Sequence, residues 1–172
     1  MIAAFDTYYY DNDKARTVGI LFEQWTAAET AGSYSEVRDG IAAYTPGEFY
    51  RRELPCILSL LKQMPAGKLE AIVVDGFVYL DDDGKPGLGA HLSHALQDAV
   101  PVIGVAKTNF ATLVHRKRAL LRGNSNRPLY ITAAGMDMDA AAAHIQSMAG
   151  PYRIPHLLKQ LDALTRQQEF PL

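Results

Sequence analysis

The sequence predicts an α/β protein with a mixed central sheet that is covered by helices on both faces. Two observations support this fold class. Two strand-like runs joined by a short polar turn open the chain, which indicates an antiparallel hairpin. Helical and buried-strand patterns then alternate along the rest of the chain, as they do in sheets that pack helices on both sides.

The first strand is expected over residues 2–10 (IAAFDTYYY), an apolar and aromatic run with Asp6 in its middle. The returning strand is expected over residues 17–25, after a polar turn around Asn12 and Asp13. A third strand is expected over residues 34–41. The tyrosines at the end of the first strand suit strand packing better than base stacking.

A helix is expected after the turn at residues 44–47 (YTPG) and before residues 65–67 (PAG). Pro46 suits a first helical turn, where its missing N–H would have no partner. Glu53 shares a helical face with apolar residues at four-residue spacing, namely Phe49, Ile57 and Leu61. A carboxylate on such a face needs a partner, because burying an unpaired charge is unfavourable. On these residues alone, the partner is either a structural arginine or a metal ion.

Residues 70–75 (EAIVVD) form an unbroken, β-branched run that is typical of a central strand buried on both faces. Asp75 ends this run, at the edge where open α/β sheets build their sites. A helix is expected over residues 88–99 and another buried strand over residues 100–108, which carries Lys107 near its end. The remaining elements are a strand at residues 129–132 and helices around residues 138–148 and 155–168.

This order places acids on the first strand, on the first long helix and at the end of a central strand. Such an arrangement can bring three carboxylates from distant positions into one cleft. Hard divalent cations prefer oxygen ligands, and Mg²⁺ is usually held by one or two carboxylates, waters and substrate phosphate. The pattern therefore indicates phosphodiester chemistry.

The composition is that of a cytoplasmic globular protein, with 48% hydrophobic and 21% charged residues. The 172 residues are expected to form one domain, residues 1–172. No apolar run reaches membrane-spanning length, and the N-terminus has no signal-peptide pattern. The single Cys56 excludes an internal disulfide, and its apolar neighbours indicate a buried side chain rather than a nucleophile.

A formal net charge of −2 means that nucleic-acid binding would need a local basic patch. One segment provides such a patch: His115, Arg116, Lys117, Arg118, Arg122 and Arg127. Its residues alone are also compatible with an ordinary solvated loop.

Several short motifs, in order along most of the chain, resemble the endonuclease V family of metal-dependent nucleases. They are Asp6-Thr7-Tyr8-Tyr9; Tyr44, Pro46 and Gly47 followed by Arg52-Glu53; Val73-Val74-Asp75-Gly76; Gly87-Leu88-Gly89-Ala90-His91-Leu92; and the run from Val100 to Thr108 with Lys107. The resemblance implies a ribonuclease-H-like fold, a Mg²⁺ or Mn²⁺ cofactor and a monomer. It also implies cleavage of DNA or RNA on the 3′ side of deoxyinosine or inosine, with a role in repair.

Carried over residue by residue, the resemblance implies that Asp6, Glu53 and Asp75 are metal ligands. It places Lys107 near the scissile phosphate and His156 near the metal site. Tyr44 and Pro46 would belong to a wedge that separates the strands, Gly47 would bind nucleic acid beside them, and Gly76 would belong to a loop that encloses the displaced base. The alternative for Lys107 is a surface lysine at a strand end, and for His156 a surface or capping residue. His91 is expected to pack or to donate a hydrogen bond.

The loop after Asp75 departs from the family pattern. It reads FVYLDDD over residues 77–83, with Val78 in place of a glycine and acids in place of a basic group. The three acids are expected to form a solvated loop, or else to bind a divalent ion. Three hypotheses follow: cleavage beside deaminated purines; the same metal core acting on flapped, branched or single-stranded nucleic acid; and a non-catalytic nucleic-acid-binding module. The resemblance implies the first, the altered loop favours the second, and the clustered acids argue against the third.

Overall fold

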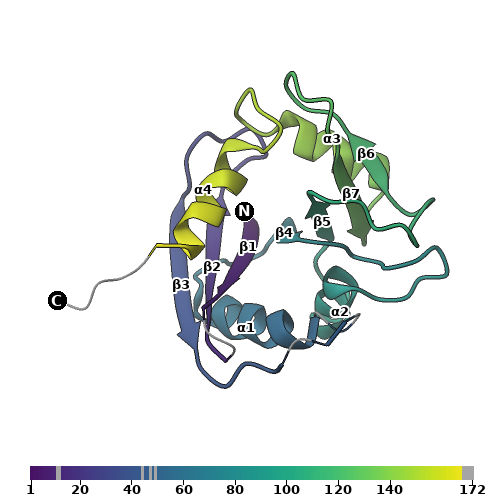
Figure 1. Ribbon diagram of the computed structural model, residues 1–172. Helices are drawn as coiled ribbons and strands as arrows, with labels where there is room; N and C mark the ends of the chain where they lie inside the picture. The colour runs from purple at the N-terminus through teal and green to yellow at the C-terminus, as the bar shows by residue number, and fades with distance from the viewer. Residues whose placement is uncertain (11–12, 44, 47, 49, 168–172) are drawn as a thin grey trace.

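A computed structural model describes residues 1–167 of the chain except 11–12, 44, 47 and 49. In this part of the chain a seven-stranded sheet has the order β3-β2-β1-β4-β5-β7-β6 (Figure 1). Strand β1 pairs antiparallel with β2 and parallel with β4, so the predicted mixed sheet is confirmed. The strands are β1 (Ile2–Tyr9), β2 (Ala15–Phe22), β3 (Gly32–Arg38), β4 (Ala71–Asp75), β5 (Val102–Ala106), β6 (Arg118–Leu120) and β7 (Leu129–Ala134).

Helices cover both faces of the sheet, as the alternating pattern predicts. The helices are α1 (Tyr50–Gln63), α2 (Leu88–Ala95), α3 (Met138–Ser147) and α4 (His156–Thr165). Figure 1 shows α1 and α2 on one side of the sheet and α3 and α4 on the other. In the described residues, no helix is both long enough and apolar enough to span a membrane.

Two apolar cores result, one on each face of the sheet. Successive side chains of a strand point to opposite faces. Ala4, Val73 and Ile103 therefore pack under α3 and α4, whereas Phe5 and Val74 pack under α1 and α2. This alternation also decides on which face the polar residues at the strand ends emerge.

Besides shifts of up to three residues at the ends of other elements, two elements differ from the sequence prediction. Strand β6 lies inside the basic segment, where no strand was expected, and it pairs antiparallel with β7. Helix α2 ends at Ala95 rather than near residue 99. Gln97 and Asp98 have φ angles of 57° and 54°, and this left-handed conformation ends the helix.

Candidate active site

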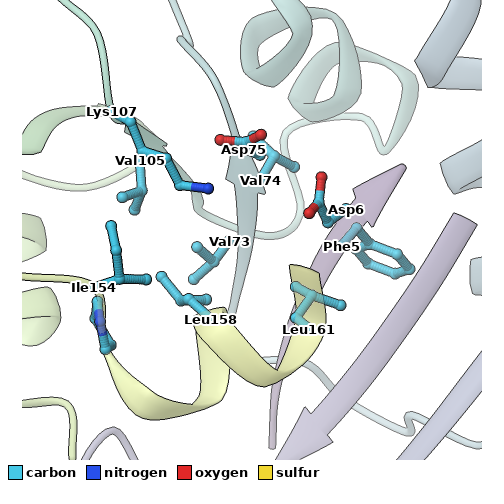
Figure 2. Close-up of a pocket in the computed structure, with 11 residues that line it drawn as sticks. Phe5, Asp6, Val73, Val74, Asp75, Val105, Lys107, Ile154, Leu158 and Leu161 are labelled. Carbon is cyan, nitrogen blue, oxygen red and sulfur yellow. The ribbon is translucent and has the colours of Figure 1, made fainter. Parts of the chain in front are cut away.

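The parallel pairing of β1 with β4 brings two of the predicted ligands side by side. The register pairs Phe5 with Val74, so the next positions, Asp6 and Asp75, are neighbours. Residues in register on parallel strands point to the same face, about 5 Å apart. Figure 2 shows the carboxylates of Asp6 and Asp75 directed into one cavity, which α4 closes on one side with Leu158 and Leu161.

Lys107 lies on the same face because of its position after β5. Val105 pairs with Asp75. Lys107 follows two residues later, so its side chain points to the same face of the sheet as that of Val105. Figure 2 shows the amino group of Lys107 directed toward the two carboxylates. Its positive charge acts to lower the pKa of both Asp6 and Asp75. The structure thus brings these three predicted residues together.

Glu53 approaches the same centre from α1. Its side chain is 2% exposed, next to buried Ile57, which agrees with the helical face that the spacing predicts. Burial raises the pKa of Glu53 well above its ordinary value, and the negative charges of Asp6 and Asp75 raise it further. A hydrogen bond with the Thr7 side chain and the charge of Arg52 oppose this rise.

The pKa of the Asp6 carboxylate is strongly raised. Asp6 is 8% exposed. Burial, followed by the charge of Asp75, raises the pKa of Asp6 from 3.8 to about 7, although its carboxylate accepts a 2.8 Å hydrogen bond from the Thr7 N–H. Asp75 lies exposed at the end of β4. Nearby protein atoms nevertheless displace water from its carboxylate, which raises the pKa of Asp75, and the charge of Lys107 opposes this rise. Negative charge therefore exceeds positive charge at this centre.

The chemistry of this centre fits a hard divalent cation. In the described residues, however, no three His, Cys, Asp or Glu side chains stand close enough together to hold a metal ion without rearrangement. No salt bridge compensates Asp6, Glu53 or Asp75 in this part of the chain. A bound cation would offset the repulsion between these carboxylates and so lower their raised pKa values.

Asp162 on α4 is a fourth acid of this centre, and the sequence analysis missed it. Its charge raises the pKa of both Asp6 and Asp75, and its carboxylate accepts a 3.3 Å contact from the Arg166 guanidinium. Asp162 lies four residues after Leu158, so the helical period places both on the side that faces the cavity.

His156 lies elsewhere. It is exposed at the start of α4 and lines a separate hollow with Glu29 and Gln160. His156 and Asp162 are six residues apart, which places them on different sides of the helix. Of these two residues of α4, Asp162 is the one whose charge acts on the two aspartates.

The loop that follows Asp75 is closed by its own contacts. Gly76 has a φ of +119°, which favours glycine, and its N–H donates to the carbonyl of Val105. Val78 is 0% exposed. Its N–H donates to the Thr132 hydroxyl at 2.8 Å, and its carbonyl accepts from the Gly87 N–H at 2.8 Å. A Cβ added to Gly89 would lie 2.6 Å from Val78 Cγ2, so the valine side chain fills the space beside α2.

The expected wedge lies at the loop before α1. Pro46 is exposed there, and the Glu48 N–H donates to the Thr45 carbonyl at 2.9 Å, which closes a turn around it. Tyr44 and Gly47 lie outside the described residues.

The acids of residues 81–83 organise the loop that carries the basic segment. The Asp82 carboxylate accepts hydrogen bonds from three successive N–H groups, those of Val114, His115 and Arg116, at 2.8–3.2 Å. Partial desolvation alone would raise the pKa of Asp82, but these donors outweigh it and lower the pKa. Asp81 accepts from the Lys85 N–H within its own loop. The three acids lie at or near the surface, and Asp82 in addition anchors residues 114–116.

Arg116, Lys117 and Arg118 do not form one even patch. Arg116 lies over the Tyr79 ring, and Lys117 contacts Asn109 and lies over Tyr130. Arg118 forms a 2.6 Å salt bridge with Asp139 of α3. All three stay at or near the surface, with Arg116 and Arg118 exposed.

Arg122 is not part of a basic surface, so its inclusion in the sequence-predicted patch was wrong. It is 3% exposed and donates to the carbonyls of Met148, Gly150 and Tyr152. Arg153, in turn, donates to the carbonyls of Lys107 at 2.6 Å and Pro128 at 2.9 Å. Two arginines therefore fix the α3–α4 loop and tie it to the backbone of Lys107.

Comparisons with known proteins point to one family. A family model described as Endonuclease V matches residues 1–122. Endonuclease V of Streptomyces avermitilis is 29% identical over 143 residues, which cover 72% of this chain but only 61% of the relative, so this match spans less than two thirds of that protein. The crystal structure of Endonuclease V from the same organism has a TM-score of 0.81 at 26% identity, covering 96% of this chain and 79% of that chain.

More distant structures share the fold. Endonuclease V of Ciona intestinalis, in complex with a 24mer DNA containing an inosine followed by a ribo-adenosine, has a TM-score of 0.81 at 16% identity and covers 96% of this chain and 84% of that chain. An Argonaute of A. aeolicus has a TM-score of 0.55 at 15% identity, covering 98% of this chain and 29% of that chain. The ribonuclease-H-like arrangement expected from the sequence is confirmed.

Proposed function

The chain belongs to the Endonuclease V family, and we propose that it is a metal-dependent endonuclease that hydrolyses phosphodiester bonds in DNA or RNA. The observation that supports this most strongly is the convergence of Asp6, Asp75 and Lys107 on one face of the sheet. Acids beside a lysine suit phosphate chemistry, whereas binding alone would not need a cluster of carboxylates beside a phosphate. A non-catalytic binding module is therefore disfavoured.

Asp6, Glu53 and Asp75 would hold a Mg²⁺ or Mn²⁺ ion, which when bound supplies charge neutralisation and an activated water. Lys107 is a point charge suited to binding the scissile phosphate. Arg153 fixes the backbone carbonyl of Lys107 and so orients this lysine. Asp162, held by Arg166, faces the same centre and is suited to accept a proton from the attacking water.

The first candidate substrate is a strand containing a deaminated purine, cut on the 3′ side of deoxyinosine or inosine as part of nucleic-acid repair. Family membership supports this candidate, as does the Ciona intestinalis relative that was crystallised with inosine-containing DNA. The exposed Pro46 turn before α1 agrees with a contact to nucleic acid.

A second candidate is a flapped, branched or single-stranded nucleic acid cut by the same metal core. The buried side chain of Val78 favours it. A loop that receives a displaced base needs room and unpaired polar groups. Here the N–H and carbonyl of Val78 already bond to Thr132 and Gly87, and the valine side chain packs against α2.

Cleavage of matched oligonucleotides, with and without one deoxyinosine or inosine, separates the candidates. The assay is run in Mg²⁺ and in Mn²⁺, with Asp75→Asn as the inactive control. A cut 3′ to the lesion that is lost in the variant supports the first candidate. Metal-dependent cutting of flaps or single strands without lesion dependence supports the second. Absence of metal-dependent cutting on every substrate refutes the proposed function.

A further inference from the structure

A groove lies beside the candidate active site, along exposed residues of α4. It consists of two adjoining hollows that share Tyr152, Ile154 and Lys159. The inner hollow also contacts Lys107 and Asp162. Lys107 and Ile154 belong in addition to the cavity of the two facing aspartates. We call this surface, whose lining includes Glu29, Lys107, Tyr152, His156, Lys159 and Asp162, the α4 groove.

The aromatic ring of Tyr152 is the most unusual feature of the α4 groove. Tyr152 is 70% exposed, although its backbone is held firmly. Its carbonyl accepts a 2.6 Å hydrogen bond from Arg122, which also holds Met148 and Gly150 on the same loop. The next residue, Arg153, is tied to Lys107 and Pro128. The ring is thus presented to solvent by a fixed backbone, which keeps the entropy cost of binding a flat partner low.

The charges along the α4 groove favour a polyanion on its inner half. Lys107 and Lys159 are exposed cations that line the inner hollow, and His156 lines the outer hollow. Two acids also line it. Asp162 faces the aspartate cluster and contacts Arg166, and Glu29 lies at the outer rim. Lys107 and Lys159 therefore provide the contacts for phosphate along this groove.

We propose that the α4 groove binds an unpaired nucleic-acid strand adjacent to the scissile bond, with Lys159 on a phosphate and Tyr152 stacked on a base. This proposal rests on the proposed endonuclease function and specifies the substrate as one with single-stranded character beside the cut. Aromatic side chains combined with cations along a groove are the general means of holding single strands, because every unpaired base offers a flat face. A base pair inside a duplex offers no such face.

Fluorescence anisotropy tests the proposal directly, with a short fluorescein-labelled DNA single strand of mixed sequence in the presence of a chelator. Tyr152→Ala is expected to weaken binding about 5- to 100-fold, the range that base–aromatic stacking supports. Tyr152→Phe keeps the ring and is expected to bind like wild type. Lys159→Gln is expected to weaken binding and to reduce the salt slope by about one. Lys62→Gln, an exposed lysine on α1 across the sheet, is the matched control and is expected to change nothing.

Cleavage kinetics on a flapped substrate provide the second readout. Tyr152→Ala is expected to raise KM with little change in kcat, because stacking away from the reacting phosphate contributes to binding. Unchanged binding by both Tyr152→Ala and Lys159→Gln, in variants that melt like wild type, would overturn the groove proposal even if cleavage is observed. Absence of metal-dependent cleavage by wild type would instead refute the proposed function, and the chelator experiment would still decide the groove.

Discussion

Replacing Asp6 with asparagine is expected to stabilise the protein when divalent cations are absent. Asp6 is 8% exposed, and burial together with the charge of Asp75 raises its pKa from 3.8 to about 7. Each pKa unit corresponds to about 1.4 kcal/mol, so the ionised carboxylate costs about 4 kcal/mol of folding free energy above that pKa. Asparagine has nearly the same shape but alters the local hydrogen bonds. We therefore expect the free energy of unfolding to rise by about 2–4 kcal/mol.

The sign of the pH dependence follows from the direction of this pKa shift. The pKa of Asp6 is higher in the folded than in the unfolded protein, so folding takes up a proton between the two values. The contribution of Asp6 to stability is fully present below about pH 4 and is lost as the pH rises through about 7. The advantage of Asp6→Asn should therefore grow across this window and stay constant above it.

Urea unfolding in a chelator, at about pH 5 and about pH 8, measures the effect. At the higher pH the melting temperature of the variant should also exceed that of wild type by about 5–15 °C. Asp83→Asn, a change at an exposed acid, is the control and should stay within about 0.5 kcal/mol of wild type. Added Mn²⁺ should stabilise wild type more than Asp6→Asn. A variant that is no more stable than wild type at about pH 8 in chelator would refute the electrostatic reasoning.

Three further predictions concern the surroundings of this centre. Val78→Gly is expected to lower the free energy of unfolding by about 2–4 kcal/mol, measured by urea unfolding, because it empties a fully buried position; a cost near zero would show that the loop is not packed. Asp82→Ala is expected to speed amide hydrogen exchange at residues 114–116 and to weaken nucleic-acid binding, and unchanged exchange would contradict its anchoring role. Arg153→Ala is expected to lower kcat more than it raises KM, with partial rescue by Arg153→Lys, because it positions Lys107; a pure KM effect would argue against this role.

The sequence predicted those residues of the candidate active site that lie on regular, strongly patterned elements. Asp6 lies within an apolar strand, and Asp75 ends another. Such strands pair in a register that the hydrophobic pattern largely determines. Glu53 lies on a helix face whose apolar spacing is visible in the sequence, and the structure buries that face. For these residues, local pattern and tertiary position agree.

Asp162 was missed, and Arg122 was wrongly assigned to the surface, because no local sequence pattern indicates what surrounds either side chain. An acid on an amphipathic helix resembles a solvent-facing residue, and only the packing of α4 across β1 turns Asp162 toward Asp6. Arg122 follows a basic run and resembles a surface residue, yet the carbonyls that bury it come from Met148 to Tyr152, more than twenty-five residues away. Asp82 is a similar case, since its donors lie on another loop.

The loop that follows Asp75 and the α4 groove lead to the same expectation about which nucleic acids the protein selects. Selecting a base requires polar groups that are free to bond to it, because discrimination arises when a wrong base leaves them unpaired. The N–H and carbonyl of Val78 bond within the protein. The α4 groove instead offers a flat ring and lysines, which accept any base and any phosphate. If both features act in binding, selectivity depends on whether the strand is unpaired at the cut, and a deaminated purine helps only as far as its weaker pairing frees the strand.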